Sequence, residues 1–281
     1  MISTTILSVV TFVYFAAFAF YLFYMIFGKK FWGKLATFTV LGGFLAQSVA
    51  LIIRWKTSYG LGIGHIPLSN FYESLIFFAW TIVLLHLLME WRLKNRSLGV
   101  FVLPMAFLLM AFASISPNVV SHIEPLVPAL QSNWLTGHVL TCFLGYAAFT
   151  VAFALGLIYF SQSRMAGNGK RTGIFSRLIP GEHIIDELMY QSVALGFVFL
   201  TLGILTGSVW AHYAWGSYWS WDPKETWSLI TWLIYALMLH ARHVRGWRGK
   251  RIAIMAIIGF GCVLFTYLGV NFLPGLHSYL T

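Results

Sequence analysis

The stretch TILSVVTFVYFAAFAFYLFYMIF, residues 5–27, decides the fold because it is long, apolar and free of charged side chains. About 20 consecutive apolar residues are enough for an α-helix to cross the hydrocarbon core of a bilayer. The whole chain shares this character: 59% of its 281 residues are hydrophobic and 9% are charged, whereas a soluble domain carries about 25% charged residues. We therefore predict that residues 5–27 form a transmembrane helix.

Further apolar stretches of comparable length follow along the chain. They are residues 35–53, 71–88, 98–114, 135–161, 188–210, 227–240 and 252–271. The stretch at 227–240 is the shortest, so its helix must begin near Asp222 to cross the bilayer fully. We predict an all-α, polytopic integral membrane protein of about eight transmembrane helices, folded as a single domain over residues 1–281.

The basic residues predict which side of the membrane each loop faces, because short cytoplasmic loops are enriched in Lys and Arg. One set of alternate loops holds fifteen of the 18 basic residues, and the other set, which includes both termini, holds Arg54, Lys56 and Lys224. We therefore expect both termini on the non-cytoplasmic side. The formal net charge of +10 is thus a topology signal, and we expect the lipid bilayer, and no nucleic acid, as a partner.

A tryptophan-rich segment lies in one of the outer loops. Residues 210–227 read WAHYAWGSYWSWDPKETW and contain five of the twelve Trp residues. One interpretation is an aromatic belt at the membrane interface. Another is that Asp222, Pro223 and Glu225 form the capping box that begins the next helix. A third is that the loop presents indole faces to a large flat ligand such as a porphyrin, with Lys224 beside an anionic propionate. The residues by themselves leave all three open.

The spacing within this loop matches a known signature. The pattern Trp215-Gly-x-x-Trp219-x-Trp221-Asp222-Pro-x-x-x-Trp227 resembles the tryptophan-rich "WWD" motif of the haem-handling proteins of cytochrome c maturation, the CcmC, CcmF and CcsA proteins. Three further segments, PLSNFYES at 67–74, WLTGH at 134–138 and NFLPGLHSY at 271–279, resemble the CcsA (ResC) family. The resemblance spans most of the chain.

The resemblance assigns haem ligands. By themselves, His138 and His277 are polar residues at the outer ends of two predicted helices; the resemblance implies that both are axial ligands of haem iron on the outer face. His240 lies within a predicted membrane helix, where an ionisable residue is a functional hypothesis by default, although it could also pack near Arg242. The resemblance implies that His240 ligates a second, intramembrane haem. The platform for the outer haem would comprise Trp215, Trp219, Trp221, Asp222, Lys224 and Trp227.

The function implied by the resemblance is that of a haem-binding subunit of a cytochrome c maturation complex. It would translocate haem b and present it on the outer face for thioether attachment to apocytochrome c bearing Cys-x-x-Cys-His. Its partner would be a CcsB (ResB)-type membrane protein, which would supply the other ligand of the inner haem. Holocytochrome c synthase (haem lyase) activity is expected only from the pair, and no residue here is assigned a catalytic role. The location would be the inner membrane of a bacterium, or the thylakoid membrane of a plastid.

The alternative function is a secondary transporter of another solute. Ion-coupled carriers generally place an acid within the membrane, and none of the eight acidic residues falls at mid-bilayer in this topology. Among the remaining candidate ligands, His86 is expected to pack within its helix, and His65, His122 and His212 to lie in outer loops facing solvent or a partner. Cys142 lies four residues after His138, hence on the same helix face, and is expected to be a buried thiol.

Overall fold

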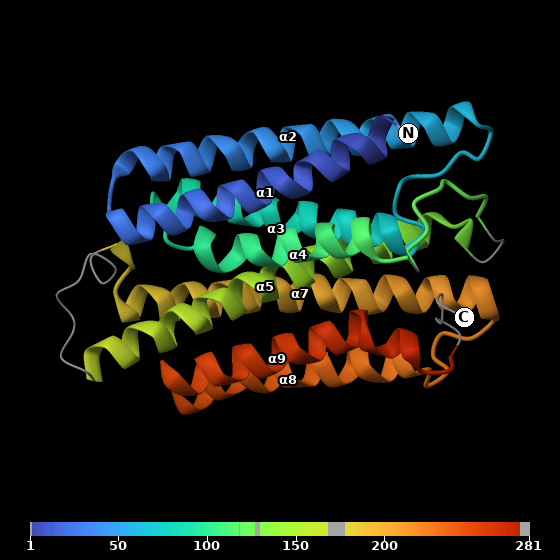
Figure 1. Ribbon diagram of the computed structural model, residues 1–281. Coiled ribbons are helices and arrows are strands. Elements are labelled where there is room, and N and C mark those ends of the chain that lie inside the picture. Colours follow the sequence, from blue (N-terminus) through green and yellow to red (C-terminus); the bar gives the residue numbers. More distant parts are fainter. Residues whose placement is uncertain (1, 118, 127–129, 168–177, 276–281) are drawn as a thin grey trace. The chain divides into compact units, whose positions relative to one another are not determined.

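The computed structural model describes residues 2–117, 119–126, 130–167 and 178–275. Within these ranges it contains eight long α-helices (Figure 1). They are α1 (Ile2–Phe27), α2 (Lys30–Gly60), α3 (Phe71–Leu93), α4 (Gly99–Ile115), α5 (Asn133–Gly167), α7 (Glu182–Trp215), α8 (Pro223–Arg245) and α9 (Lys250–Tyr267), followed by the short 3₁₀ helix η2 (Gly269–Phe272).

Helix length and composition confirm an all-α polytopic membrane protein. Six helices, α1, α2, α3, α5, α7 and α9, are long and apolar enough to cross a bilayer. Helix α4 is shorter, at 17 residues, and contains Pro104. Helix α8 begins at Pro223, one residue after Asp222, as its predicted crossing of the membrane requires.

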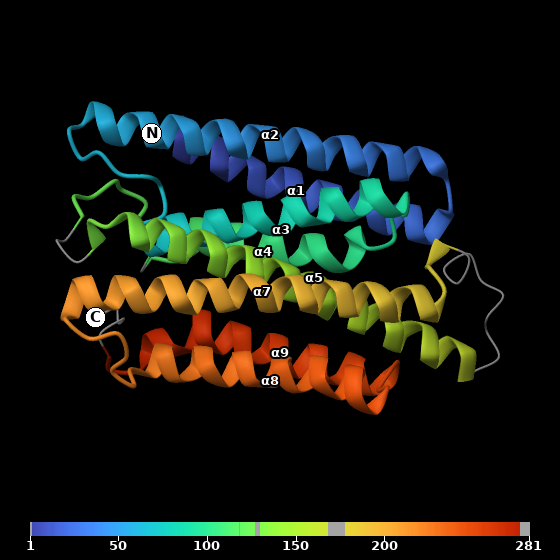
Figure 2. The ribbon, with the colours of Figure 1, turned by 180° about the vertical axis from the view of Figure 1, so that it is seen from behind.

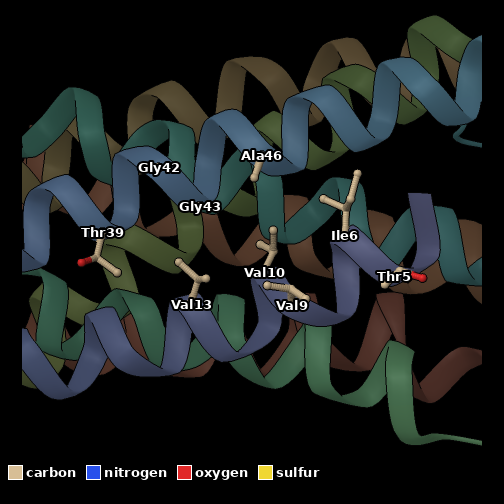
Figure 3. A pocket seen from close by; sticks show the side chains of 9 residues that line it. All are labelled: Thr5, Ile6, Val9, Val10, Val13, Thr39, Gly42, Gly43 and Ala46. Carbon is tan, nitrogen blue, oxygen red and sulfur yellow. The ribbon is translucent and has the colours of Figure 1, made fainter. Parts of the chain in front are cut away.

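The described residues group into two compact units, which we treat separately. Unit 1 comprises the described residues within 1–123 and 157–185, and unit 2 comprises those within 124–156 and 186–281. In unit 1, α1 packs against α2 and α4, and α3 packs against α4 (Figures 1 and 2). An open groove of about 460 Å³ separates parts of α1 and α2 and is lined by Val9, Val13, Gly42 and neighbouring apolar side chains (Figure 3). Its lining is suited to contact with hydrocarbon.

A buried ion pair anchors one end of unit 1. The Arg54 guanidinium donates to Glu73 Oε1 at 2.6 Å, and the two side chains are 3% and 1% exposed. Arg54 also donates to the carbonyl oxygens of Ser121 at 2.9 Å and His122 at 3.2 Å, and Asn70 caps α3 by accepting from the Glu73 amide at 2.8 Å. The PLSNFYES segment therefore joins α2, α3 and the chain after α4.

His65, which was expected to face solvent or a partner from an outer loop, is instead buried within the chain. Its Nδ1 lies 2.8 Å from the Ser69 hydroxyl. Ser69 in turn donates to Glu73, so His65 belongs to the network around the Arg54–Glu73 ion pair.

Helix α5 packs closely on its neighbours in unit 2, and glycines allow the approach. A Cβ at Gly145 would lie 3.1 Å from the Gly196 carbonyl oxygen of α7, and a Cβ at Gly156 would lie 3.2 Å from the Ala253 carbonyl oxygen of α9. The rings of Phe149 on α5 and Tyr235 on α8 stack with centroids 3.6 Å apart. Helices α7, α8 and α9 are thus each positioned against α5.

The ends of α7 and α8 are held by charge. Arg242 donates to Asp186 at 2.6 Å and to Glu187 at 2.9 Å. The second oxygen of Asp186 accepts the Gly249 amide at 2.7 Å, so one carboxylate connects α7, α8 and the turn into α9. His240 lies two residues before Arg242 but does not share these bonds, because its side chain is on the exposed face of α8.

Candidate functional site

The site in unit 2 is built around His138, near the start of α5. Its Nδ1 lies 2.7 Å from the Gly203 carbonyl oxygen of α7. A carbonyl oxygen only accepts hydrogen bonds, so Nδ1 carries the ring proton. In the neutral imidazole, the lone pair of Nε2 is then available to a metal. Metal-ligating histidines commonly have their other ring nitrogen fixed in this way.

Two glycines on α7 make room for this imidazole. A Cβ at Gly207 would lie 2.5 Å from His138 Nδ1, and a Cβ at Gly203 would lie 2.5 Å from Cys142 Sγ. The indole of Trp210, which is only 2% exposed, lies nearly parallel to the His138 ring with centroids 6.0 Å apart. Backbone, glycines and indole together fix the orientation of His138. The sequence interpretation missed Gly203, Gly207 and Trp210, although the four-residue spacing of the glycines was a usable signal.

Lys224 and Cys142 belong to the same part of unit 2. Cys142 Sγ lies 3.7 Å from His138 Nδ1, and its half-buried position agrees with a packed thiol more than with an exposed one. The Lys224 ammonium, from the first turn of α8, is close enough for its charge to interact with both His138 and Cys142. The fold therefore brings together His138 and Lys224, two of the residues predicted to bind haem.

The tryptophan-rich loop connects α7 to α8, and its end is a capping box. Asp222 accepts from the Lys224 amide at 3.0 Å, and Glu225 accepts in return from the Asp222 amide at 3.2 Å. Glu225 also accepts from the Ser220 amide at 2.7 Å. The capping interpretation of Asp222, Pro223 and Glu225 is thus confirmed, and the same bonds fix the shape of the loop.

Trp221 is both strained and exposed. Its φ of +58° lies in the left-handed region, which costs a residue with a Cβ roughly 1–2 kcal/mol. Its indole is nevertheless 69% exposed, so no burial of its own offsets that strain. Such strain persists where the surrounding structure enforces it, and it is common at binding sites. The bonds of Glu225 to the neighbouring amides provide that enforcement.

The other predicted platform indoles have different surroundings. Trp219 packs edge-on against Trp221, with ring centroids 5.7 Å apart. Trp215 packs on the buried Trp210 at 4.8 Å. Trp227 packs on Phe265 of α9 at 4.2 Å. Within the loop, Trp219 and Trp221 are thus the indole pair, whereas Trp215 and Trp227 pack against the helices.

His277 lies outside the described residues. The chain leading to it reaches α8, because a Cβ at Gly275 would lie 2.5 Å from Asp222 Oδ1 and 3.1 Å from Pro223 Cδ. The side chain of Asp222 is only 6% exposed. Gly275 therefore lies against the capping box that begins α8.

His240 belongs to a separate location. It is exposed on α8 together with Leu233, Leu237 and Val244, and this spacing places all four on one helix face. Sixteen residues separate it from Lys224, which is about 24 Å along an α-helix. His240 and the residues around His138 therefore cannot share one ligand. No cluster of three or more His, Cys, Asp or Glu side chains suited to a metal ion occurs in the described parts of the chain.

The helical architecture with a tryptophan-rich loop defines a class of membrane protein. The solved structure named Cytochrome c Heme Lyase CcmF has the same fold, with a TM-score of 0.64 at 19% identity, over 95% of this chain and 50% of that one. The family described as "Cytochrome C assembly protein" matches residues 68–277, so the chain belongs to this family.

The relatives by sequence are CcsA proteins. The chain is 46% identical over 235 residues to "Cytochrome c biogenesis protein CcsA" of Chlamydomonas reinhardtii, covering 82% of this chain and 64% of that protein. It is 41% identical to the CcsA of Pyropia yezoensis, covering 88% and 87% of the two chains. It is also 41% identical to the CcsA of Synechococcus elongatus, covering 84% of each.

Proposed function

We propose that this chain is a haem-binding subunit of a cytochrome c maturation complex and that His138 is an axial ligand of the haem it presents. The observation that carries the proposal is the hydrogen bond from His138 Nδ1 to the Gly203 carbonyl oxygen, which leaves Nε2 available to iron. The same unit of the chain carries the indole pair Trp219 and Trp221. The CcsA relatives and the CcmF fold neighbour are named for the same process, which supports the proposal.

The residues around His138 suit a bound haem b. Haem, when bound, supplies an iron that accepts axial ligands and vinyl groups that can form thioethers with apocytochrome c. Trp221 and Trp219 would cover part of its apolar surface, and Lys224 would pair with a propionate. Asp222 would act indirectly, because its cap positions Lys224. We propose His277 as the second axial ligand on the basis of the family motif.

His240 supports a second haem site that a partner completes. Its imidazole lies on an outward face of α8 among Leu233, Leu237 and Val244. A haem ligated from this face would leave its other axial position directed away from α8, toward a second protein. A CcsB-type partner would supply that ligand, and synthase activity toward Cys-x-x-Cys-His would belong to the pair. We place the pair in a bacterial or thylakoid membrane, with the tryptophan-rich loop on the non-cytoplasmic side.

The test is the haem content and absorbance of the complex purified with a CcsB-type partner. In His138→Ala the iron loses a strong ligand, so the Soret band should shift and haem should be lost on washing. Added imidazole should restore both, because it can occupy the vacated position. The matched control is His243→Ala, which removes an exposed imidazole at the far end of α8 and should behave as wild type.

Two outcomes would contradict the proposal. One is a wild-type Soret band and full haem retention in His138→Ala. The other is an equal loss of haem in His138→Ala and His243→Ala, which would indicate a general defect in folding instead of a lost ligand.

A further inference from the structure

A second cluster of titratable side chains lies inside unit 1, whereas the tryptophan-rich loop belongs to unit 2. His86 and Glu90 on α3 are 0% and 6% exposed, and their Nε2 and Oε2 atoms are 3.5 Å apart. Tyr21 on α1 and Thr37 on α2 each donate a hydroxyl to a different oxygen of Glu90. Arg96, in the turn after α3, lies 3.4 Å from Glu90 Oε1.

The hydrogen bonds of Tyr21 determine which ring nitrogen of His86 carries the proton. The Tyr21 hydroxyl donates its only hydrogen to Glu90. The Tyr21 oxygen lies 3.2 Å from His86 Nε2 and can therefore only accept a hydrogen bond from it. Nε2 therefore carries the ring proton, and Nδ1 is unprotonated, with its lone pair available as an acceptor. This Nδ1 is buried and has no hydrogen-bond partner among the described residues. A buried acceptor left unpaired costs about 1–3 kcal/mol, so its presence requires an explanation.

The surrounding charges suit one additional proton. With neutral His86, the Glu90 carboxylate and the Arg96 guanidinium balance each other, and protonation of Nδ1 would place an imidazolium 3.5 Å from the carboxylate. The other groups facing the cluster are Tyr21 and Tyr24 from α1, and the uncharged Thr37 from α2. Helix α4 contributes Gly99 and has no titratable side chain.

Packing favours a proton over a larger ligand. A Cβ at Gly99 would lie 2.6 Å from the Tyr21 ring, and a Cβ at Gly33 would lie 2.8 Å from Arg96 Cδ. The side chains of the cluster are thus fixed by close neighbours. The Arg96 side chain is 32% exposed and donates to Thr37 at 2.9 Å, so polar groups continue from the surface to Glu90 and His86.

We propose that His86, Tyr21 and Glu90 form a proton-binding site within the membrane-embedded part of unit 1, loaded from the side of the membrane on which Arg96 lies. His86 Nδ1 accepts the proton, and Glu90 stabilises the resulting imidazolium. The site gives the chain a means of responding to the proton concentration on that side. It does not depend on the haem ligands proposed for unit 2.

The experiment is nitrogen NMR of the purified chain labelled with ¹⁵N-histidine, recorded over a range of pH. The His86 signals are assigned by their loss in His86→Gln. At alkaline pH they should report a neutral ring protonated on Nε2, and acidification should convert it to imidazolium while the protein stays folded. In Glu90→Gln the ratio of charged to neutral His86 at a given pH should fall by about 10- to 1,000-fold, because an opposite charge at this distance has been removed.

Two further variants separate a proton site from simple packing. Tyr21→Phe keeps the ring against Gly99 but removes the acceptor of the Nε2 proton, so His86 should become a mixture of tautomers. If His86→Gln fails to fold, the change of signals in Tyr21→Phe identifies those of His86. Glu187→Gln, which alters a 44% exposed carboxylate in unit 2, should leave the His86 signals unchanged. Any of three results would overturn the proposal. His86 could stay neutral at every pH at which the protein is folded, or its titration in Glu90→Gln could equal that of the wild type. The neutral ring could also carry its proton on Nδ1, which would indicate that Nδ1 donates to a buried water.

Discussion

Substitution of Gly207 by alanine tests whether His138 binds iron from the position that the structure gives it. The new Cβ would lie 2.5 Å from His138 Nδ1 and 2.7 Å from Cε1, whereas carbon atoms in contact are about 3.5–4.0 Å apart. The imidazole must therefore move by roughly 1 Å, and its 2.7 Å hydrogen bond to Gly203 cannot survive such a shift.

The size of the effect follows from that lost hydrogen bond. Removing the group that orients a metal-ligating histidine typically costs about 10- to 100-fold in affinity, so haem retention in Gly207→Ala should fall by that factor. Overpacking costs about 1–3 kcal/mol, and alanine recovers about 0.5–1 kcal/mol of helix stability. The folded protein should therefore survive the change. The assay is the rate of haem loss from the purified complex to an excess of apomyoglobin, with thermal unfolding measured in parallel.

The matched control adds the same methyl group next to the same histidine. Gly137 precedes His138 on α5, and a Cβ there would meet nothing within 4 Å among the described residues. Gly137→Ala should therefore lose haem at the wild-type rate. Equal rates of haem loss in Gly207→Ala and Gly137→Ala would refute the reasoning, because the iron would then be insensitive to the position of His138.

Two other expectations follow from the structure, and a third follows from the distribution of the basic residues along the chain. Trp221→Gly relieves the left-handed strain at φ +58° but removes the indole. Haem content should therefore fall, without rescue by imidazole, while the melting temperature stays the same or rises. A fall in both haem content and melting temperature would indicate that Trp221 has a purely structural role. Arg242→Met leaves Asp186 and Glu187 without their cation and should destabilise unit 2 by about 3 kcal/mol, measured by thermal unfolding; an unchanged melting temperature would contradict this. Reporter fusions after Gly169 and Gly249 should be cytoplasmic and one at the C-terminus external; an external reporter at Gly169 would reverse the topology.

The helical architecture and the capping box could be predicted because both depend on residues close together in the sequence. A membrane helix requires a run of apolar residues, and 5–27 supplies one within α1. Likewise Asp222 and Glu225 are three residues apart, the spacing that a capping box needs, and their bonds are present in the structure. Patterns of this kind are complete within a single segment.

The support of His138 and the polar cluster of unit 1 could not be predicted in the same way. Gly203 is 65 residues from His138, and Tyr21 is 69 residues from Glu90. The periodicity of one sequence predicts the helix face on which a residue lies, but it does not predict which residue of another helix packs against that face. His86 was accordingly expected to be a packing residue, and the structure shows its Nε2 against Tyr21 and Glu90.

The two described histidines with a proposed haem ligand role differ in what fixes them, and this difference bears on how the chain would work. His138 is held by a backbone carbonyl and enclosed by Trp210 and the glycines of α7, so its lone pair is oriented before any ligand arrives. The preorganised ligand loses little side-chain entropy on binding. His240 is exposed on α8, and its rotamer remains free until a second surface covers it. The proposed outer site would thus hold haem with the chain's own groups, whereas the proposed inner site at His240 would be incomplete without a partner. Transfer between the two would therefore run from the site that depends on the partner toward the one that the chain preorganises.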